Sequence, residues 1–352
     1  MSRYRLNLYS LVMLMLTMSC SRLEGDRGAE RIRVIYDTDM GNDTDDILGL
    51  IMLHRYTDLG MVDLIGVCSS KEHPYSARYI DLLNTWYRHP DIPVGVAVNG
   101  PEVDSIMAIP RYTKTVVDME SNGKPLFNRS IENYEGLLPA ARLYRKLLAT
   151  CPDRSVVVIM VGMSTNLAAL LATSPDEFSG LTGRQLVERK VDYLCMMGGN
   201  FSEPLPECNI VTDSAASSIV LRDWPTRIVI SPFEVGRSVS YPAESFASDF
   251  NFVEHHPLIE ARKWYSPEPQ NSPTWDMTAV LYAVEGDRGY FNLSEPGRVT
   301  LGWEPGIKHH IVTHFTPDKN GKHFYLSITP EQGDRILKRF LEIVPIDPNN
   351  NN

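Results

Sequence analysis

Short apolar runs rich in Val and Ile alternate along the chain with longer segments in which apolar residues recur at helical spacing. Runs of the first kind predict buried strands, and segments of the second kind predict helices. The expected strands cover residues 32–36, 61–68, 92–98, 155–161, 191–197 and 227–231, and the expected helices cover 47–54, 75–87, 135–150, 165–173 and 214–221. This order predicts an α/β fold with an open, mostly parallel, doubly wound sheet flanked by helices.

Two later stretches depart from this alternation. Residues 100–133 carry scattered Gly, Pro, Asn and Ser with little periodicity, which predicts a long loop. From residue 290 onward the pattern predicts C-terminal hairpin strands over 298–303, 310–314 and 324–328, followed by a closing helix over 330–343. No composition break or internal repeat indicates a second domain, so we expect one domain over 31–346 and a disordered tail over 347–352.

The N-terminal segment has the features of an export signal. Arg3 and Arg5 precede a short apolar run over residues 11–16, and Ser19-Cys20 follows. An apolar run this short cannot span a bilayer, which favours a secretory signal over residues 1–20. The Ser-Cys ending resembles a bacterial lipoprotein signal, so we expect an exported protein of the periplasm or outer membrane. Its only membrane contact would be a lipid on Cys20, with residues 21–30 as a tether.

Composition and charge suit a soluble globular protein. The 352 residues are 43% hydrophobic and 22% charged, with a net charge of −10. This acidic balance argues against nucleic acid as a partner, because nucleic-acid backbones are met by basic surfaces. No Cys-x-x-Cys spacing of a zinc site is present, and Cys68 and Cys195 lie in apolar strand-like runs. We therefore expect no structural disulfide.

Five aspartates occur between residues 37 and 46, between the first expected strand and the first expected helix. The carboxyl end of a strand is where ligands bind in open α/β sheets. Like charges this close repel one another unless a cation lies among them, and hard divalent cations such as Ca²⁺ prefer carboxylate and carbonyl oxygens. An acidic helix cap would explain one or two of these acids, but not Asp37 and Asp39, which end the strand. The run therefore predicts a metal site.

Two other acidic motifs fit the run less well. An EF-hand loop starting at Asp37 would need Gly and Glu where the chain has Asn42 and Leu48, so this motif is excluded. A phosphate-transferring Asp-x-Asp-x-Thr loop would need Thr where the chain has Gly41. A phosphotransferase-type hydrolase with Asp37 as nucleophile therefore remains a weaker alternative.

The acid run resembles the Asp-Thr-Asp-x-Gly…Asp-Asp signature of the inosine/uridine-preferring nucleoside hydrolases, with two extra residues before the final pair. Two further segments match in the right order. Residues 161–166 (Val-Gly-Met-Ser-Thr-Asn) resemble the family's Gly-Pro-Leu-Thr-Asn loop, and residues 197–209 begin with Met-Gly-Gly and end with Glu-Cys-Asn, where the family has Glu-Phe-Asn. The resemblance covers nearly all of the chain after residue 30.

The resemblance implies a site in which one Ca²⁺ binds the ribose hydroxyls and a water molecule. The role of Asp43, which lies in the insertion, stays open. Trp275 stands where the family often has the His that protonates the leaving base, so it would either stack on a purine base or serve as a core aromatic. The implied metal ligands are Asp39, Asp45, Asp46, Asp276 and the carbonyl of Val161, with Asp39 also as catalytic base. The implied substrate-binding residues are Glu207, Asn209, Asn200, His73 and Trp275, with Lys71 as the alternative to His73 in the place of a family Asn after the second strand.

The resemblance thus implies Ca²⁺-dependent hydrolysis of purine-leaning ribonucleosides to free base and ribose, by an enzyme that forms a homodimer or a homotetramer. The replacement of the family His by Trp275 keeps a second hypothesis open. In that hypothesis the chain is a non-catalytic, Ca²⁺-dependent nucleoside- or sugar-binding lipoprotein.

Overall fold

The computed structural model describes residues 31–101, 112–286, 288–306, 311–345 and 347–348. The chain from Ile32 onward forms one compact unit. The expected signal, the lipid site at Cys20 and the tether over 21–30 lie outside the described residues, as do the last four residues of the expected tail. Within the described residues, no helix has the length and apolar character needed to cross a membrane.

A mostly parallel sheet forms the centre of the fold, as the alternating pattern predicted. Its parallel strands lie in the order β3-β2-β1-β6-β7-β8-β14, and the antiparallel strands β12 and β13 extend it beyond β14. The bounds are β1 Ile32–Thr38, β2 Val62–Ser69, β3 Val94–Val96, β6 Val156–Met160, β7 Val191–Met197, β8 Arg227–Ser231, β12 Gly297–Trp303, β13 Ile311–Pro317 and β14 His323–Ser327.

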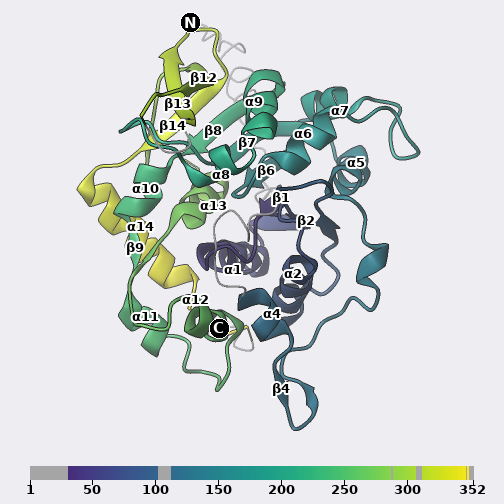
Figure 1. The fold of residues 1–352 in the computed structure, drawn as a ribbon, viewed down its shortest axis with the longest axis vertical. Coiled ribbons are helices and arrows are strands. Elements are labelled where there is room, and N and C mark those ends of the chain that lie inside the picture. The colour runs from purple at the N-terminus through teal and green to yellow at the C-terminus, as the bar shows by residue number, and fades with distance from the viewer. Residues whose placement is uncertain (1–30, 102–111, 287, 307–310, 346, 349–352) are drawn as a thin grey trace, which may run out of the picture. The chain divides into compact units, whose positions relative to one another are not determined.

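Helices cover both faces of this sheet, which confirms the doubly wound arrangement (Figure 1). Successive residues of β6 enter different cores: Val157 and Ile159 pack on one face, whereas Val156 and Val158 pack on the other. The first face is covered by α1 (Asp45–Asp58), α2 (Pro74–Trp86), α13 (Trp275–Glu285) and α14 (Pro330–Ile343), and the second by α5 (Ala140–Thr150), α6 (Thr165–Leu171), α7 (Gly183–Lys190) and α9 (Ser214–Asp223).

The structure corrects three details of the predicted elements. The strand expected as part of a C-terminal hairpin, β14, joins the main sheet parallel to β8, because hydrophobic pattern alone does not show which neighbour a strand pairs with. The expected loop over 100–133 contains α4 (Tyr112–Val117) and a hairpin of β4 (Glu120–Ser121) and β5 (Lys124–Pro125). The helix expected from residue 135 begins only at Ala140, after a 3₁₀ turn over Tyr134–Gly136.

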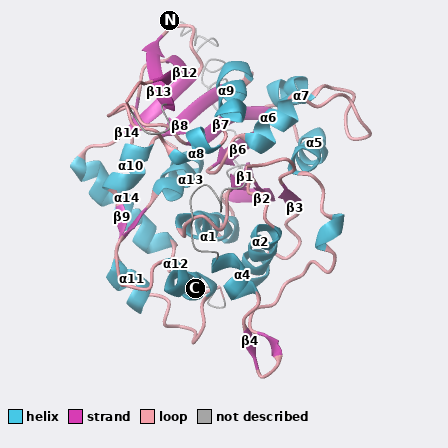
Figure 2. Cartoon of the chain, viewed as in Figure 1, coloured by secondary structure: helices cyan, strands magenta, loops and turns pink. Residues whose placement is uncertain are grey.

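Several short elements between β7 and β12 were not predicted, and all of them except α12 are too brief to show a period. Figure 2 shows how loops link the helices and strands of this part of the chain. The short elements are α8 (Cys208–Thr212), α10 (Phe233–Ser238), β9 (Ser240–Tyr241), α11 (Ala243–Ser248), α12 (Pro257–Tyr265), β10 (Ser272–Pro273) and β11 (Asn292–Leu293).

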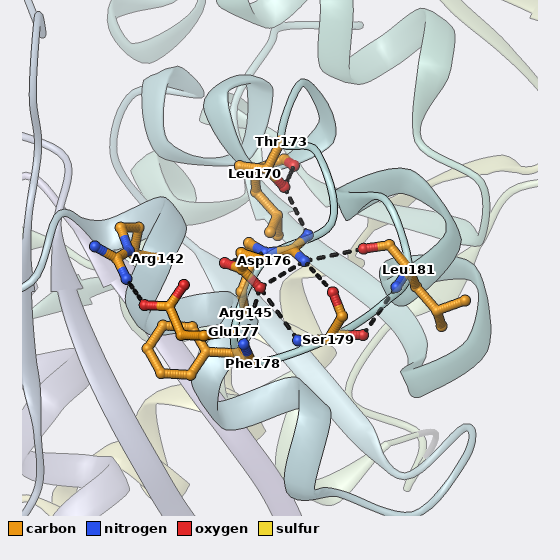
Figure 3. A network of polar contacts seen from close by, with 9 residues as sticks. All are labelled: Arg142, Arg145, Leu170, Thr173, Asp176, Glu177, Phe178, Ser179 and Leu181. Carbon is orange, nitrogen blue, oxygen red and sulfur yellow. Dashed lines mark hydrogen bonds and ion pairs between the residues drawn. The ribbon is translucent and has the colours of Figure 1, made fainter.

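A buried arginine on α5 holds the loop that connects α6 to α7 (Figure 3). Arg145 is 1% exposed, and its guanidinium forms a two-point ion pair with Asp176, with N–O distances of 2.7 and 2.8 Å. It also donates to the hydroxyl of Thr173 and to the carbonyls of Ser179 and Leu181, at 2.9, 3.0 and 2.9 Å. The planar guanidinium of buried Arg145 therefore links the partly exposed α6–α7 connection to α5 through an ion pair and three further hydrogen bonds.

The cysteines in the described part of the chain are free thiols. Cys68, Cys151 and Cys195 are buried, and Cys208 is half-buried. Burial raises the pKa of the thiols of Cys68, Cys151 and Cys208, the last of them to about 12. These side chains therefore remain protonated at neutral pH and behave as small apolar groups.

Candidate active site

The acid run forms the loop that joins β1 to α1, at the carboxyl end of the central strand. Neighbouring elements fix its path. The hydroxyl of Ser76 donates to the carbonyl of Met40 at 2.7 Å, and the hydroxyl of Tyr112 donates to the carbonyl of Asp43 at 2.6 Å. The hydroxyl of Thr38 donates to Asp46 Oδ1. Hydrogen bonds from α2, α4 and β1 thus hold these like charges in one place.

Folding brings Asp276 to this loop from far along the sequence. Asp276 lies in the first turn of α13, and its backbone N–H donates to Asp45 Oδ2 at 3.1 Å. One carboxylate oxygen from each of Asp43, Asp45 and Asp276 lies within 4.8 Å of the others. The proximity of Asp276 to the acid run, on which the metal hypothesis depends, is therefore present in the fold.

Burial makes the ionised form of these acids costly. It raises the pKa of Asp39 to about 7 and that of Asp45 to about 6, and it raises the pKa of Asp43, Asp46 and Asp276 well above the ordinary range. The charges of the neighbouring aspartates add to each rise. A divalent cation would relieve both the burial and the repulsion, because it favours the charged form of each ligand.

The residues present fit a hard divalent cation. Three carboxylates converge, and Asp46 adds a buried oxygen, Oδ2, that has no hydrogen-bond partner among the described residues. Buried carboxylate oxygens normally have partners, so an unsatisfied one beside a carboxylate cluster is a place for a cation. The cluster differs from the expected ligand set, because Asp43 replaces Asp39 and Asp46 in the group of three.

A cavity of about 220 Å³ opens beside the acid loop. It lies at the carboxyl ends of β1, β6, β7 and β8, which is the expected place for a ligand in this type of sheet. Its wall contains both acidic and aromatic side chains. The lining residues are Asp39, Asn42, Asp43, Val161, Met197, Glu207, Cys208, Asn209, Phe233, Tyr265, Trp275 and Asp276.

Glu207 and Asn209 reach the cavity from the start of α8. Glu207 caps this helix, since its carboxylate accepts the backbone N–H groups of Asn209 at 2.9 Å and of Ile210 at 3.1 Å. The Asn209 side chain donates to the carbonyl of Val161 at 2.7 Å. Burial raises the pKa of Glu207 to about 7. Three residues that the resemblance assigned to ribose and metal thus lie together.

Close packing of backbone segments places Val161 beside the acid loop. Gly162 follows it, and a Cβ at this position would lie 2.6 Å from the backbone nitrogen of Asp39, closer than real Cβ atoms come. The next residue, Met163, donates its N–H to the hydroxyl of Ser70 at 3.2 Å. Glycine is therefore required here so that the loops after β1, β2 and β6 can meet.

Asn200 and His73, expected to contact the substrate, are not among the residues that line this cavity. The side-chain oxygen of Asn200 instead accepts the backbone N–H groups of Ser202 and Glu203, at 3.2 and 3.1 Å. His73 caps α2, and its Nδ1 accepts the N–H of Tyr75 at 3.2 Å. Both side chains serve local turns, for which Asn and His are well suited.

Asp37 faces away from the cavity and is fully buried. Its carboxylate accepts hydrogen bonds from the hydroxyl of Tyr144 at 3.0 Å and from the side-chain amide of Asn166 at 3.1 Å. Burial raises its pKa to about 8, although both hydrogen bonds oppose the rise. Because the cavity lining does not include this carboxylate, the geometry gives a phosphate-transferring role for Asp37 no support.

Trp275 lines the cavity and is half-buried. Its ring stacks on Phe233, with centroids 5.5 Å apart and planes 22° apart, and its Nε1 donates to the carbonyl of Phe233 at 3.1 Å. The α10 backbone passes directly over Trp275 at Gly236, where a Cβ would collide with the tryptophan. The ring is thus held in one orientation at the wall of the cavity.

Besides Asp43, whose role stayed open, sequence reasoning assigned no role to five lining residues: Asn42, Met197, Cys208, Phe233 and Tyr265. Asn42 lies within the acid run itself, and Phe233 follows the carboxyl end of β8, so the rule that ligands bind at strand ends could have indicated both. Tyr265 ends α12, a short helix that no sequence pattern predicted. Its ring lies edge-on to Tyr112 of α4, with centroids 6.4 Å apart, and no local signal indicates this contact.

Comparison with known proteins places this site in a family. The family model described as inosine-uridine preferring nucleoside hydrolase matches residues 34–327. Among curated proteins no relative matches significantly.

Solved structures share the fold at low sequence identity. A purine-preferring ribonucleoside hydrolase from Gardnerella vaginalis is 15% identical, with a TM-score of 0.65 over 89% of this chain and 98% of that one. A plant nucleoside hydrolase is 17% identical, with a TM-score of 0.63 over 88% and 98%. An inosine-uridine preferring nucleoside hydrolase from Bacillus anthracis is 14% identical, with a TM-score of 0.61 over 90% and 100%. With the family match over most of its length, the chain belongs to the inosine-uridine preferring nucleoside hydrolases, a family of enzymes that act on N-glycosyl compounds.

Proposed function

We propose that this protein is a Ca²⁺-dependent hydrolase of ribonucleosides that prefers purine bases. Family membership supports ribonucleoside hydrolysis in general. The observation that carries the finer proposal is the cavity itself, which joins a carboxylate cluster to a wall of three aromatic side chains: Phe233, Tyr265 and Trp275. A ribonucleoside has the same polarity, with vicinal hydroxyls at one end and a flat aromatic base at the other.

The metal ligands in this proposal are Asp43, Asp45 and Asp276, which lie together, with Asp46 beside them. Carboxylate oxygens suit Ca²⁺, which accepts six to eight oxygen ligands in flexible geometry. When bound, such a cation supplies positive charge that favours hydroxide over water and binds vicinal hydroxyls of a sugar.

Asp39 is the proposed general base. It lines the cavity, and although burial raises its pKa, the positive charge of a bound cation would keep its carboxylate ionised and able to accept a proton. As Asp39 takes the proton of a water molecule, the water oxygen forms a bond to the anomeric carbon. The bond from this carbon to the base nitrogen breaks, and its electron pair leaves with the base, which then takes up a proton.

The remaining lining residues orient the substrate. Glu207 and Asn209 lie beside Val161 at the sugar end, where their carboxylate and amide groups can hold ribose hydroxyls. The ring of Trp275 offers a flat surface for the base, and stacking on an aromatic ring stabilises a base by about 1–3 kcal/mol. A purine presents a larger surface than a pyrimidine, which supports the proposed preference.

The test is to incubate the purified protein with inosine, adenosine, guanosine and uridine and to measure free base by chromatography. The proposal expects more base from the purine nucleosides than from uridine. It also expects loss of activity with a chelator and recovery when Ca²⁺ is restored in excess. Recovery with Mg²⁺ but not Ca²⁺ would overturn the choice of metal, and equal rates on all four substrates would overturn the purine preference.

A second hypothesis is a nucleoside- or sugar-binding protein without turnover. It is favoured by the cavity lining, in which the described residues include no histidine to protonate the leaving base. Calorimetry with the same nucleosides distinguishes the two hypotheses. Tight binding without release of free base would support the binding protein, whereas steady release of base would exclude it.

A further inference from the structure

The loop that follows β2 carries a buried lysine beside the acid run. Lys71 is 5% exposed. The loop around it is anchored to β1, because the N–H of Ser70 donates to the carbonyl of Thr38 at 2.8 Å. The hydroxyl of Ser69 donates to the carbonyl of Lys71 at 2.9 Å. A long, charged side chain is therefore held by a fixed backbone in a place where lysine is rarely found.

Lys71 contacts the acid loop at the side chain of Asn42. Its Nζ donates to Asn42 Oδ1 at 2.8 Å, and Asn42 Nδ2 in turn donates to Asp39 Oδ2. Asn42 is 3% exposed and lines the cavity together with Asp39. These contacts form a chain of hydrogen bonds that runs from the buried cation to the carboxylate of the proposed base.

The chemistry of the three groups determines which group donates and which group accepts in each of these two hydrogen bonds. An ammonium group can only donate hydrogen bonds, so it requires the oxygen of the Asn42 amide to face it. The amide NH₂ must then face the opposite way, toward Asp39. Without the lysine the amide could turn over and present its oxygen to the carboxylate, where two acceptors would repel each other.

We propose that Lys71 is a positioning residue: through Asn42 it fixes the orientation of the Asp39 carboxylate at the cavity wall. This inference rests on the proposed function, in which Asp39 takes a proton from the attacking water. Lys71 is not among the residues that line the cavity, so it acts on the substrate indirectly, through Asn42 and through the attraction between its charge and the Asp39 carboxylate. Orientation of a reacting group mainly affects the chemical step, whereas substrate affinity depends on the other walls.

The test is a double-mutant cycle with Lys71→Met, Asn42→Ala and the double variant. Methionine keeps the length of the lysine side chain but cannot donate. We expect kcat to fall on the order of 10- to 100-fold in each single variant, with a smaller change in KM. Because the positioning effect of Lys71 runs through Asn42, the loss of kcat in the double variant should be clearly smaller than the product of the two single losses. Lys71→Arg, which keeps a cationic donor, should recover part of kcat.

Lys338→Met is the matched control, because Lys338 is an exposed residue of α14 and its variant should keep wild-type kcat. Circular dichroism checks that each variant folds. Unchanged kcat in Lys71→Met, or losses in the two single variants that add in the double variant, would overturn the positioning role. Failure of the wild-type protein to release base would instead overturn the proposed function. In that case, crystal structures decide the inference: an Asp39 carboxylate in the same orientation in wild type and Lys71→Met would refute it.

Discussion

Replacement of Asp276 by Asn tests the carboxylate cluster directly. The change keeps the size of the side chain and one of its oxygens, but removes one of the three charges that lie within 4.8 Å of one another. Two effects should follow in opposite directions. The variant should bind a divalent cation much more weakly, and without a cation it should be at least as stable as the wild type, because it no longer holds an extra buried charge among like charges.

The size of the effect follows from linkage between binding and folding. A cation at 100 times its Kd stabilises the folded state by about 2.7 kcal/mol. The compact unit begins at Ile32 and has about 320 residues, so its unfolding entropy near the midpoint is about 0.7 kcal/mol/K. The wild-type Tm should therefore rise by about 4 °C. If Asp276→Asn weakens binding about 100-fold, the same cation concentration stabilises by only about 0.4 kcal/mol, and Tm should rise by less than about 1 °C.

The assay is thermal unfolding at pH 7.5, followed by circular dichroism, first with chelator and then with Ca²⁺ in excess. Asp192→Asn is the matched control, since Asp192 is an exposed residue of β7 outside the cavity. Its variant should show the full shift in Tm. An equal shift in Asp276→Asn and wild type would refute the reasoning. So would a large loss of stability of Asp276→Asn in chelator, because the residue would then have a structural role that does not depend on a cation.

Three other predictions concern the base-binding wall and the stability of the fold. Trp275→Leu should raise KM for inosine roughly 5- to 100-fold by loss of stacking, while KM for uridine should change less. Initial-rate kinetics with both substrates would test this, and equal changes in the two KM values would contradict it. Arg145→Met should lower the free energy of unfolding by about 1.5–3 kcal/mol, because the buried guanidinium no longer donates charge-assisted hydrogen bonds to Asp176, whose side chain is 20% exposed; urea titration would contradict this if the loss were below about 1 kcal/mol. Burial lowers the pKa of His256 to about 3, and its Nδ1 must stay unprotonated to accept the N–H of Leu258. Between about pH 6.5 and pH 3, His256 therefore takes up a proton in the unfolded chain but not in the folded protein. Stability should therefore fall with pH in this window, by about 2 kcal/mol at pH 5, and His256→Asn should remove this part of the loss; the same pH dependence of unfolding in both proteins would refute it.

Much of the fold could be predicted from the sequence, because its signals are local. Strands such as β6 are continuous runs of Val and Ile, and helix α5 follows helical spacing over most of its length. Both patterns indicate which residues are buried, because burial depends mainly on whether a side chain is apolar and on the spacing of apolar side chains along the chain. The acid run is local in the same sense, and its position after a strand indicated where a ligand would bind.

The neighbours of each element depended on tertiary structure. The strand pattern of β14 gave no indication that it pairs in parallel with β8, because pairing is decided by the packing of the whole sheet. Local context likewise did not show that the side chains of Asn200 and His73 accept hydrogen bonds from backbone groups of their own turns. Polar residues of this kind contact either a ligand or the backbone, and only the folded path of the chain decides which.

The sequence by itself determined the parallel α/β architecture and the chemistry available at the end of β1, because both depend on residues that are close together in the sequence. Tertiary structure alone decided which side chains meet there. It brought Asp43 into the cluster with Asp276, placed Tyr265 and Phe233 in the lining of the same cavity, and joined Lys71 to Asn42. The physical reason is that a contact between distant residues depends on the packing of every element between them, whereas burial and turn formation depend mainly on the residues close by.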